Sequence, residues 1–140
     1  MKGILWIICL ILTMTSCSSS GNTIFPSNIQ LKPGDVVFRR GGGFTSHVVI
    51  AADRKGRYSH VGIVVDSANH PMIVHSVPGE PDFKGDPDRV KMETPERFFI
   101  DMNASEGEVC RPADSVIARK AAIIALGKYR QHILFDHDYD

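Results

Sequence analysis

Tyr58-Ser59-His60-Val61-Gly62-Ile63-Val64-Val65 is the stretch of this sequence that decides the fold. Its second half is an apolar run rich in β-branched side chains, a pattern typical of a strand buried on both faces of a sheet. Residues 66–71 then supply a turn, and residues 72–77 have the composition of a second strand. Because the connection is short, we expect an antiparallel hairpin at the centre of the sheet, with His60 at the mouth of its first strand.

Turn and capping signals bound the remaining elements on either side of this hairpin. The expected elements are a turn at 32–35, strands at 36–38 and 108–111, a helix capped by Thr45 or Ser46 and ending at 52, a loop at 79–89, a short helix from 95 capped by Thr94, and a helix over 115–130 opened by Asp114. In the last helix, Ile117, Ala121, Ile124 and Ala125 are spaced as an apolar stripe that faces the core. The predicted fold class is α+β, a small antiparallel β-sheet packed with helices.

The length and composition of the chain limit the number of domains and the kinds of partner. With 140 residues, 43% of them hydrophobic, the chain can bury one modest core, so residues 29–140 are expected to form a single domain. The formal charges balance, with 16 basic and 16 acidic residues. No stretch clusters basic and aromatic side chains as a phosphate-tracking groove requires, which argues against a nucleic acid as partner.

The N-terminus has the composition of an export signal. Lys2 precedes an apolar run at 4–12, about half of the ~20 residues that a membrane-spanning helix requires. Met14-Thr15-Ser16-Cys17 resembles the lipobox of bacterial lipoproteins, with ordinary cleavage nearby as the alternative. The resemblance implies a signal peptide over 1–16 and a flexible tether over 17–28 that begins at a lipidated Cys17. Two acyl chains would hold the exported protein in the cell envelope, at the outer membrane on the periplasmic side in a Gram-negative organism.

The cysteines leave one thiol in the domain itself. Cys9 lies in the signal segment and Cys17 is expected to be acylated, so no intramolecular disulfide is expected. Cys110 lies inside a strand pattern with no helix N-terminus behind it. We therefore expect Cys110 to be a buried structural thiol and not a nucleophile.

Three motifs together resemble a known enzyme family. They are Leu31-Lys32-Pro33-Gly34-Asp35-Val36-Val37-Phe38, Tyr58-Ser59-His60-Val61-Gly62-Ile63-Val64 and Val74-His75-Ser76-Val77-Pro78-Gly79. These motifs are similar to the permuted branch of the papain-like NlpC/P60 cysteine hydrolases, and the resemblance runs from Leu31 to Asp140. It implies a circularly permuted papain-like fold in which the nucleophilic cysteine follows a segment similar to residues 135–140. That cysteine would lie just beyond Asp140, so we expect the domain to be C-terminally incomplete in this chain.

The resemblance also implies a reaction and a site. A cysteine hydrolase needs a base that takes the thiol proton and returns it to the leaving group. His60 is expected to be this base, and His75 on the adjacent strand would orient it in a Cys-His-His triad whose cysteine is absent from these residues. Glu80 is the alternative third member. The implied activity is that of an amidase, peptidase or acyl hydrolase on peptidoglycan stem peptides or on acyl or lipid-like ligands, with no cofactor.

Other interpretations of the same residues remain open. A histidine beside a strand is often a satisfied structural residue, and the remaining histidines have the surroundings of surface or turn residues: His47, His70, His132 and His137. A metal site formed by His60, His75 and the acids of 136–140 is disfavoured, because no pair has the short ligand spacing of zinc hydrolases. The alternative function is that of a noncatalytic lipid- or peptide-binding lipoprotein.

Overall fold

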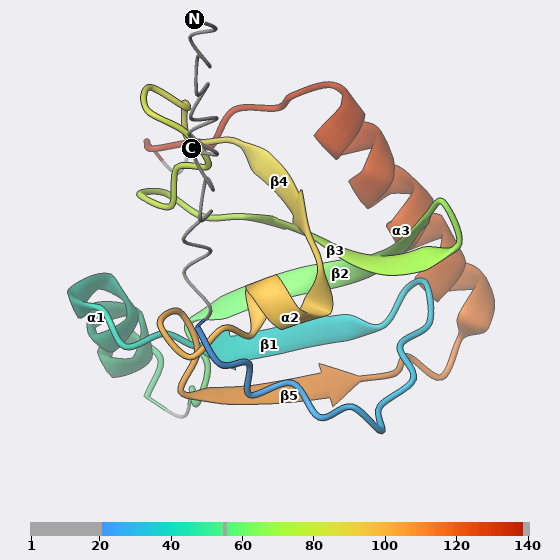
Figure 1. Ribbon diagram of the computed structural model, residues 1–140, viewed down its shortest axis with the longest axis horizontal. Helices are drawn as coiled ribbons and strands as arrows, with labels where there is room; N and C mark the ends of the chain where they lie inside the picture. The colour runs from blue at the N-terminus through green and yellow to red at the C-terminus, as the bar shows by residue number, and fades with distance from the viewer. Residues whose placement is uncertain (1–20, 55, 139–140) are drawn as a thin grey trace, which may run out of the picture.

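The computed structural model describes residues 21–54 and 56–138, which form an α+β fold around one open antiparallel sheet (Figure 1). The sheet has five strands in the order β4-β3-β2-β1-β5. The strands are β1 (Val36–Arg40), β2 (His60–Ser67), β3 (His70–Ser76), β4 (Val90–Glu93) and β5 (Glu106–Cys110), and the helices are α1 (Phe44–Ala52), α2 (Pro95–Phe98) and α3 (Ser115–Arg130). The α+β class, the small antiparallel sheet and its central hairpin are therefore confirmed.

Local signals set the helix boundaries well and the strand boundaries less well. α3 spans the expected residues, and Asp114 caps it by accepting hydrogen bonds from the backbone N–H groups of Val116 and Ile117. Thr94 caps α2 as expected, but α1 begins at Phe44 with Gly43 at its N-cap, so neither expected cap is used there. Strand β4 was not expected, because its charged side chains do not have the composition of a buried strand.

The two faces of the sheet carry two separate hydrophobic cores. On the face covered by α2, here called the α2 face, the buried side chains are Val37, Val64, Ile73, Phe98, Phe99 and Ala104. On the opposite face, Val65 of β2 and Val74 of β3 pack against Ala122 of α3. Side chains alternate between faces along a strand, so the register puts Arg39 and Lys91 on the α2 face with Val37 and His75. One half of a small core is therefore highly charged.

The apolar stripe expected on α3 is wrong in its direction. Ala118 and Ala122 face the sheet and are buried, whereas Ile117 and Ile124 are 64% and 62% exposed. The small alanine side chains let the helix lie close to the sheet, where the turn at Gly34 meets it. Gly34 has φ 93°, and a Cβ at this position would collide with the backbone of Ala118.

The N-terminal predictions fall partly on residues that the structure describes. Of the expected tether over 17–28, residues 22–25 pack on the domain: Ile24 N donates to the Phe99 carbonyl, and the Phe25 ring stacks on Phe99 with centroids 5.6 Å apart. Residues 1–20, which include the expected signal peptide and Cys17, are not among the residues that the structure describes. Within the described residues, no helix combines the length and the apolar character needed to cross a bilayer.

Gly62 controls how closely the side chains of the α2 face approach the central hairpin. It lies opposite His75 on β3 and opposite Val37 on β1. A Cβ on Gly62 would lie 2.5 Å from Cγ2 of Ile73 and 3.3 Å from Cε2 of Phe98. The missing side chain therefore leaves the space in which the Phe98 ring rests against the sheet.

We predict that Gly62→Ala destabilises the protein, because the new methyl group has to displace packed core atoms. The expected loss in the free energy of unfolding is about 1–3 kcal/mol, measured by urea denaturation. Gly42→Ala is the matched control, since a Cβ there has no neighbour within 4 Å, and it should change stability by no more than about 0.5 kcal/mol. Equal stability of the two variants would contradict the packing described for Gly62.

Candidate functional site

The two histidines singled out by sequence lie in direct contact. His60 begins β2, and His75 lies on β3 opposite Gly62, two residues further along β2. Their side chains project from the same face of the sheet, and the distance from His60 Nε2 to His75 Nδ1 is 2.9 Å. The hydrogen bond between the rings is a direct result of the hairpin register.

A third residue, Glu93 of β4, extends this pair across a further strand. Its Oε2 lies 3.2 Å from Nε2 of His75, within ion-pair distance, and neither atom forms a hydrogen bond with any described residue. The Glu93 side chain is only 9% exposed. Sequence reasoning missed this residue, although the alternation of Lys91, Met92 and Glu93 is the pattern of a strand with one charged face.

Aromatic packing holds both imidazoles in place. The Phe98 ring stacks on His60 with centroids 5.7 Å apart, and His75 meets Phe98 edge to face at 5.2 Å. Arg39, opposite His60 in the β1–β2 register, places its guanidinium carbon 4.8 Å from the centroid of the Phe98 ring. It also donates to the Phe98 carbonyl at 2.9 Å. Phe98 of α2 therefore contacts both imidazoles, and Arg39 of β1 holds Phe98 in place.

Burial and neighbouring charge set the protonation of the site. The pKa of His60 is lowered to about 3, first because burial disfavours the cation and then because Arg39 and His75 lie close. For Glu93, burial favours the neutral acid, but the contact with His75 and the charges of Arg39 and Arg97 outweigh it, so the pKa is lowered. At neutral pH, His60 is therefore a neutral imidazole and Glu93 is a carboxylate.

These charges determine which nitrogen of His60 is free. An ionised carboxylate only accepts hydrogen bonds, so the contact with Glu93 is favourable when His75 Nε2 carries the proton. In its neutral form, His75 then accepts at Nδ1, and His60 must donate from Nε2. The second nitrogen of His60, Nδ1, is left with a lone pair and no proton. The three residues thus form a relay, Glu93-His75-His60, that ends at an unprotonated nitrogen.

His60 lies at the wall of a cleft of about 470 Å³. Its rim comes from the three consecutive glycines, the N-terminal part of α1 and the segment 76–80 that follows β3. The apolar side chains in the wall are Phe44, Val49, Val77, Pro78, Met102 and Phe135. The relay therefore ends beside a space large enough for a small organic substrate.

Glu80, the alternative third member, has a different partner. Its Oε1 lies 2.6 Å from the buried guanidinium of Arg39, and its Oε2 accepts a hydrogen bond from Asn103. Its backbone carbonyl accepts a hydrogen bond from Lys91. Glu80 therefore neutralises a cation at the edge of the cleft, while His75 is the residue that contacts His60.

Cys110 is exposed, and the expectation of a buried thiol is wrong. It lies at the end of β5 opposite Val36, whereas the β1 residue opposite His60 is Arg39. The pKa of the Cys110 thiol is raised by partial desolvation of the sulfur, by a hydrogen bond to Glu108 and by the negative charge of Glu108. A raised pKa and a position at the far end of β1 agree with the expectation that Cys110 is not a nucleophile.

The remaining histidines lie apart from the site, and the described acids of the C-terminal segment, Asp136 and Asp138, belong to no group that could hold a metal ion. His47, His70, His132 and His137 are all exposed, and His137 lies 3.3 Å from Asp88. Across residues 21–54 and 56–138, no group of three His, Cys, Asp or Glu side chains is arranged to hold a metal ion.

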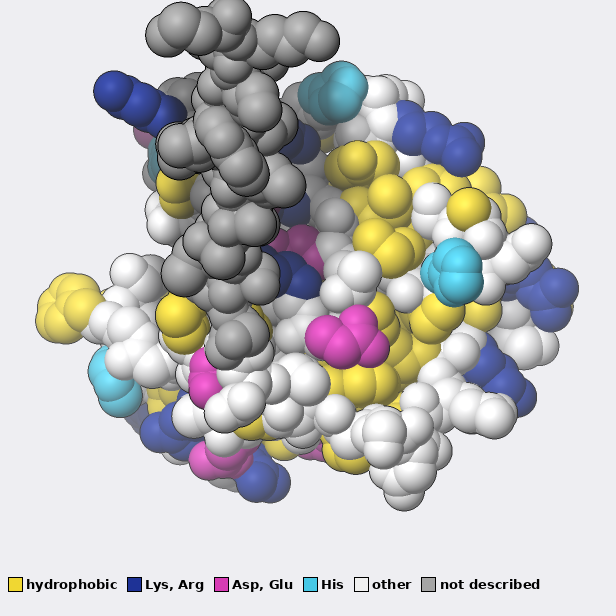
Figure 2. All heavy atoms as spheres, viewed as in Figure 1, with side chains coloured by type: hydrophobic (Ala, Val, Ile, Leu, Met, Phe, Trp, Pro, Cys, Tyr) yellow, Lys and Arg dark blue, Asp and Glu magenta, His cyan; other side chains and the backbone are white. Residues whose placement is uncertain are grey.

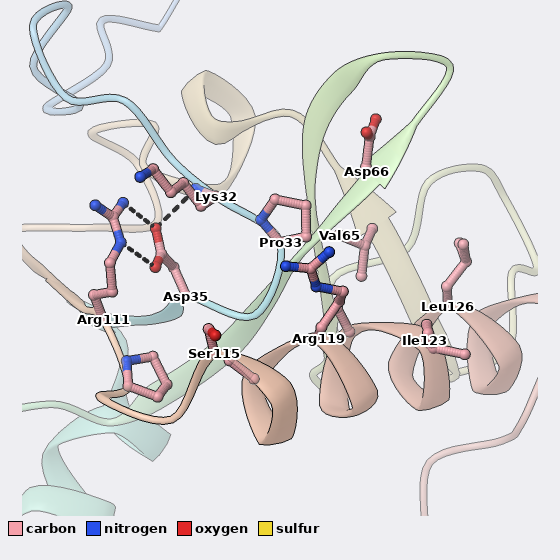
Figure 3. Close-up of a pocket in the computed structure, with 13 residues that line it drawn as sticks. Lys32, Pro33, Asp35, Val65, Asp66, Arg111, Ser115, Arg119, Ile123 and Leu126 are labelled. Atoms are coloured by element: carbon pink, nitrogen blue, oxygen red, sulfur yellow. Dashed lines mark hydrogen bonds and ion pairs between the residues drawn. The ribbon is translucent and has the colours of Figure 1, made fainter.

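A larger hollow of about 600 Å³ lies on the opposite side of the sheet, between α3 and the start of β1 (Figure 3). Its buried carboxylate, Asp35, already accepts two hydrogen bonds from Arg111 and one from the backbone of Lys32. Burial opposes the ionisation of Asp35, but the bonds from Arg111 and Lys32 prevail and lower its pKa. Asp35 thus links the start of β1 to Arg111, which follows β5, and has a structural role. No histidine lines this hollow.

Comparisons of the chain with protein-family models, with curated proteins and with solved structures found no match.

We predict that the low pKa of His60 makes the protein less stable in mild acid. Below about pH 6.5 the unfolded chain binds a proton at this residue and the folded chain does not, so stability falls as the pH falls towards 3. Between about pH 6 and pH 4.5 the free energy of unfolding should decrease by about 2 kcal/mol more in the wild type than in His60→Gln. Urea denaturation of both proteins at several pH values in this range measures the change in the free energy of unfolding.

His70→Gln is the matched control for this prediction, because His70 is exposed and begins β3 on the far side of the hairpin from His60. This variant should keep the pH dependence of the wild type. A wild-type protein whose stability changes over this range no more than that of His60→Gln would show that His60 is not buried as a neutral ring.

Proposed function

We propose that this chain is the histidine-bearing part of a cysteine hydrolase of the permuted papain-like NlpC/P60 type. The observation that carries the proposal is the relay Glu93-His75-His60, which leaves an unprotonated Nδ1 on a side chain that lines a cleft. A papain-like site needs this arrangement: one nitrogen of the catalytic histidine held by an orienting group, the other free for the thiol. The sequence motifs around His60 and His75 support the same assignment.

In the proposed reaction, Nδ1 of His60 takes the proton of a cysteine thiol that attacks the carbonyl carbon of the substrate. The imidazolium then gives this proton to the leaving amine, alcohol or thiol as the carbonyl bond to it breaks. Water attacks the resulting thioester by the reverse sequence and releases the acid. His75 passes the attraction of the Glu93 carboxylate to His60 when the ring becomes charged, which opposes the effects of burial and of Arg39 on the imidazolium.

The nucleophile is not among the described residues, and its place is suggested by the last part of the chain. Residues 133–135 lie beside β4, with hydrogen bonds from Val90 N to the Ile133 carbonyl and from Phe135 N to the Asp88 carbonyl. The Phe135 side chain lines the same cleft as His60. In the family that the chain resembles, the cysteine follows a segment similar to residues 135–140, so a thiol placed there would arrive close to the free nitrogen.

The cleft favours a substrate with an apolar or acyl part next to a carbonyl group. Its apolar wall accepts an acyl chain, and the glycines at its rim leave space for a peptide backbone. Stem peptides of peptidoglycan and acyl or lipid-like esters, thioesters and amides are therefore the proposed substrate classes. Lipidation of Cys17 would hold the enzyme in the cell envelope near both.

The second candidate is a noncatalytic lipoprotein that binds a lipid or peptide in the same cleft. It is favoured by the fact that the thiol of Cys110 lies at the other end of β1 from His60. The two candidates differ in whether a cysteine reacts with electrophiles under the control of His60.

We predict that the protein isolated from its native gene has a cysteine other than Cys110 that reacts with a thiol-directed activity probe. Mass spectrometry of the intact product and of its labelled peptide identifies that residue. His60→Ala should reduce the labelling rate by about a hundredfold or more, because the thiol loses its base. His70→Ala is the control, since that histidine is exposed, and it should leave labelling unchanged.

A native product whose only probe-reactive thiol is Cys110, or labelling that His60→Ala leaves intact, would contradict the hydrolase proposal. In that case the noncatalytic binding protein is the better account.

We predict that Glu93→Gln slows the same labelling by about tenfold while the protein stays folded, because the charge that supports the His60 imidazolium is removed. The pH at which the labelling rate falls on the acidic side should also change in this variant. A purely structural role of Glu93 would not change this pH. Glu96→Gln is the matched control, as Glu96 is exposed on α2. If both variants react with the same rate and pH profile, Glu93 is not part of the relay.

A further inference from the structure

Helix α3 concentrates positive charge in a chain whose formal charges balance overall. The whole sequence has 16 basic and 16 acidic residues. The 16 residues of α3 contain Arg119, Lys120, Lys128 and Arg130 and no acidic residue. None of these four side chains forms an ion pair with any residue that the structure describes. The helix therefore presents four free cations to its surroundings.

The outer face of α3 is also apolar. Its exposed large side chains are Val116, Ile117, Ile123 and Ile124, each between 62% and 67% exposed. In the space-filling view, hydrophobic side chains gather over the part of the molecule where α3 lies, with Lys and Arg side chains at the edge of the group (Figure 2). Apolar surface of this kind on a helix with free cations marks an interaction site.

The order of residues around the helix separates apolar and charged positions. With ~3.6 residues per turn, Val116 and Ile123 fall on one side of the outer face and Ile117 and Ile124 on the other. Lys120 lies between the two pairs, and its long stem can cover apolar surface while the ammonium group reaches outward. Arg119, Arg130 and Lys128 fall at the borders with the buried face. The face is thus an apolar strip edged by cations.

We propose that this outer face of α3 docks on the surface of an anionic lipid bilayer. Amphipathic helices that lie in the membrane interface combine exposed aliphatic side chains with Lys and Arg at the polar border. The centre of a protein interface is enriched in aromatic residues and depleted of Lys, whereas this face has no aromatic residue and a central Lys120. Two copies of α3 facing each other would bring like charges together, which opposes a dimer through this face.

The neighbouring hollow extends the cationic border. In Figure 3, Arg119, Ile123 and Leu126 of α3 and Lys32 of the turn before β1 are among the residues lining this space. Lys32 has no ion pair among the described residues, so it adds a fifth cation beside the face, while Asp66 is the acidic residue on the far wall. Lipid headgroups at the edge of α3 would meet this border.

This proposal does not depend on the hydrolase activity or on acylation of Cys17. It concerns side chains of the folded domain, and it holds whether or not another part of the chain also touches the membrane. The test must therefore report on α3 itself and not on binding of the whole protein.

A single tryptophan on α3 gives such a local signal. Trp6 is the only tryptophan in the sequence, so the full chain with Trp6→Phe and Ile124→Trp has one reporter, on the outer face of α3. With vesicles of phosphatidylglycerol and brominated phosphatidylcholine, its fluorescence should shift to the blue and be quenched. Phe83→Trp in the same background is the matched control, because Phe83 is 59% exposed in the loop that follows β3 and does not line the cleft.

Removal of charge should weaken the contact selectively. Each Lys or Arg near an anionic surface strengthens binding about fivefold, so Arg119→Gln with Lys120→Gln should lower the equilibrium constant for the quenched state about 25-fold. Arg54→Gln with Lys84→Gln removes the same charge elsewhere and should have little effect. Circular dichroism checks that each variant keeps its helices.

Three outcomes would overturn the proposal. One is absence of quenching at Ile124→Trp on anionic vesicles, and another is quenching no stronger than at Phe83→Trp. The third is a dimer, detected by sedimentation equilibrium, that Lys120→Glu or Ile124→Ser dissociates, because the face would then bind a second copy and not a membrane.

Discussion

The missing side chain at Gly62 is the constraint on which the site depends. Without a side chain at this position, Phe98 rests on the hairpin and its ring fixes His60 and His75 from one side. The antiparallel register then brings the two imidazoles within 2.9 Å and sets Glu93 of β4 next in line. A slip of one residue between these strands would turn His75 to the α3 side of the sheet and break the relay.

The α2 face holds more charge than a small core needs for stability. Arg39 and Lys91 are each only 2% exposed, and they are paired with Glu80 and with Asp82 and Asp86 of the loop that follows β3. Buried ion pairs contribute little net stability, because desolvation offsets most of their attraction. Their effect here is positional, because they tie the loop that carries Glu80 to the edge of the cleft. The charge of Arg39 also adds to burial in lowering the pKa of His60.

Much of the fold followed from local signals in the sequence. The β-branched run after His60 identified the central strand, and Asp114 and Thr94 identified the beginnings of α3 and α2. Strand β4 was missed because its inward side chains, Lys91 and Glu93, are charged, and only the tertiary contacts with His75 and the acidic loop make their burial favourable. The direction of α3 was misjudged because its core contact uses alanines, so the larger isoleucines point to solvent.

The residues of the candidate site were also predictable from the sequence only in part. His60 and His75 were predictable, since hairpin pairing follows from the turn length between two strand-like runs. Glu93 was not, because it comes from a strand that sequence patterns did not reveal and reaches His75 only through strand pairing. The exposure of Cys110 also depends on tertiary structure: β5 is an edge strand, so part of its surface has no neighbour to cover it.

The protonation state of the two ring nitrogens of His60 tests the proposed relay most directly. In protein labelled with ¹⁵N at histidine, long-range ¹H–¹⁵N spectra distinguish a protonated ring nitrogen from a bare one. The account predicts that His60 carries its proton on Nε2, has a bare Nδ1, and keeps this form down to about pH 4, in accord with a pKa of about 3. A proton on Nδ1, or an imidazolium already formed near pH 6, would contradict the relay from which the proposed function is argued.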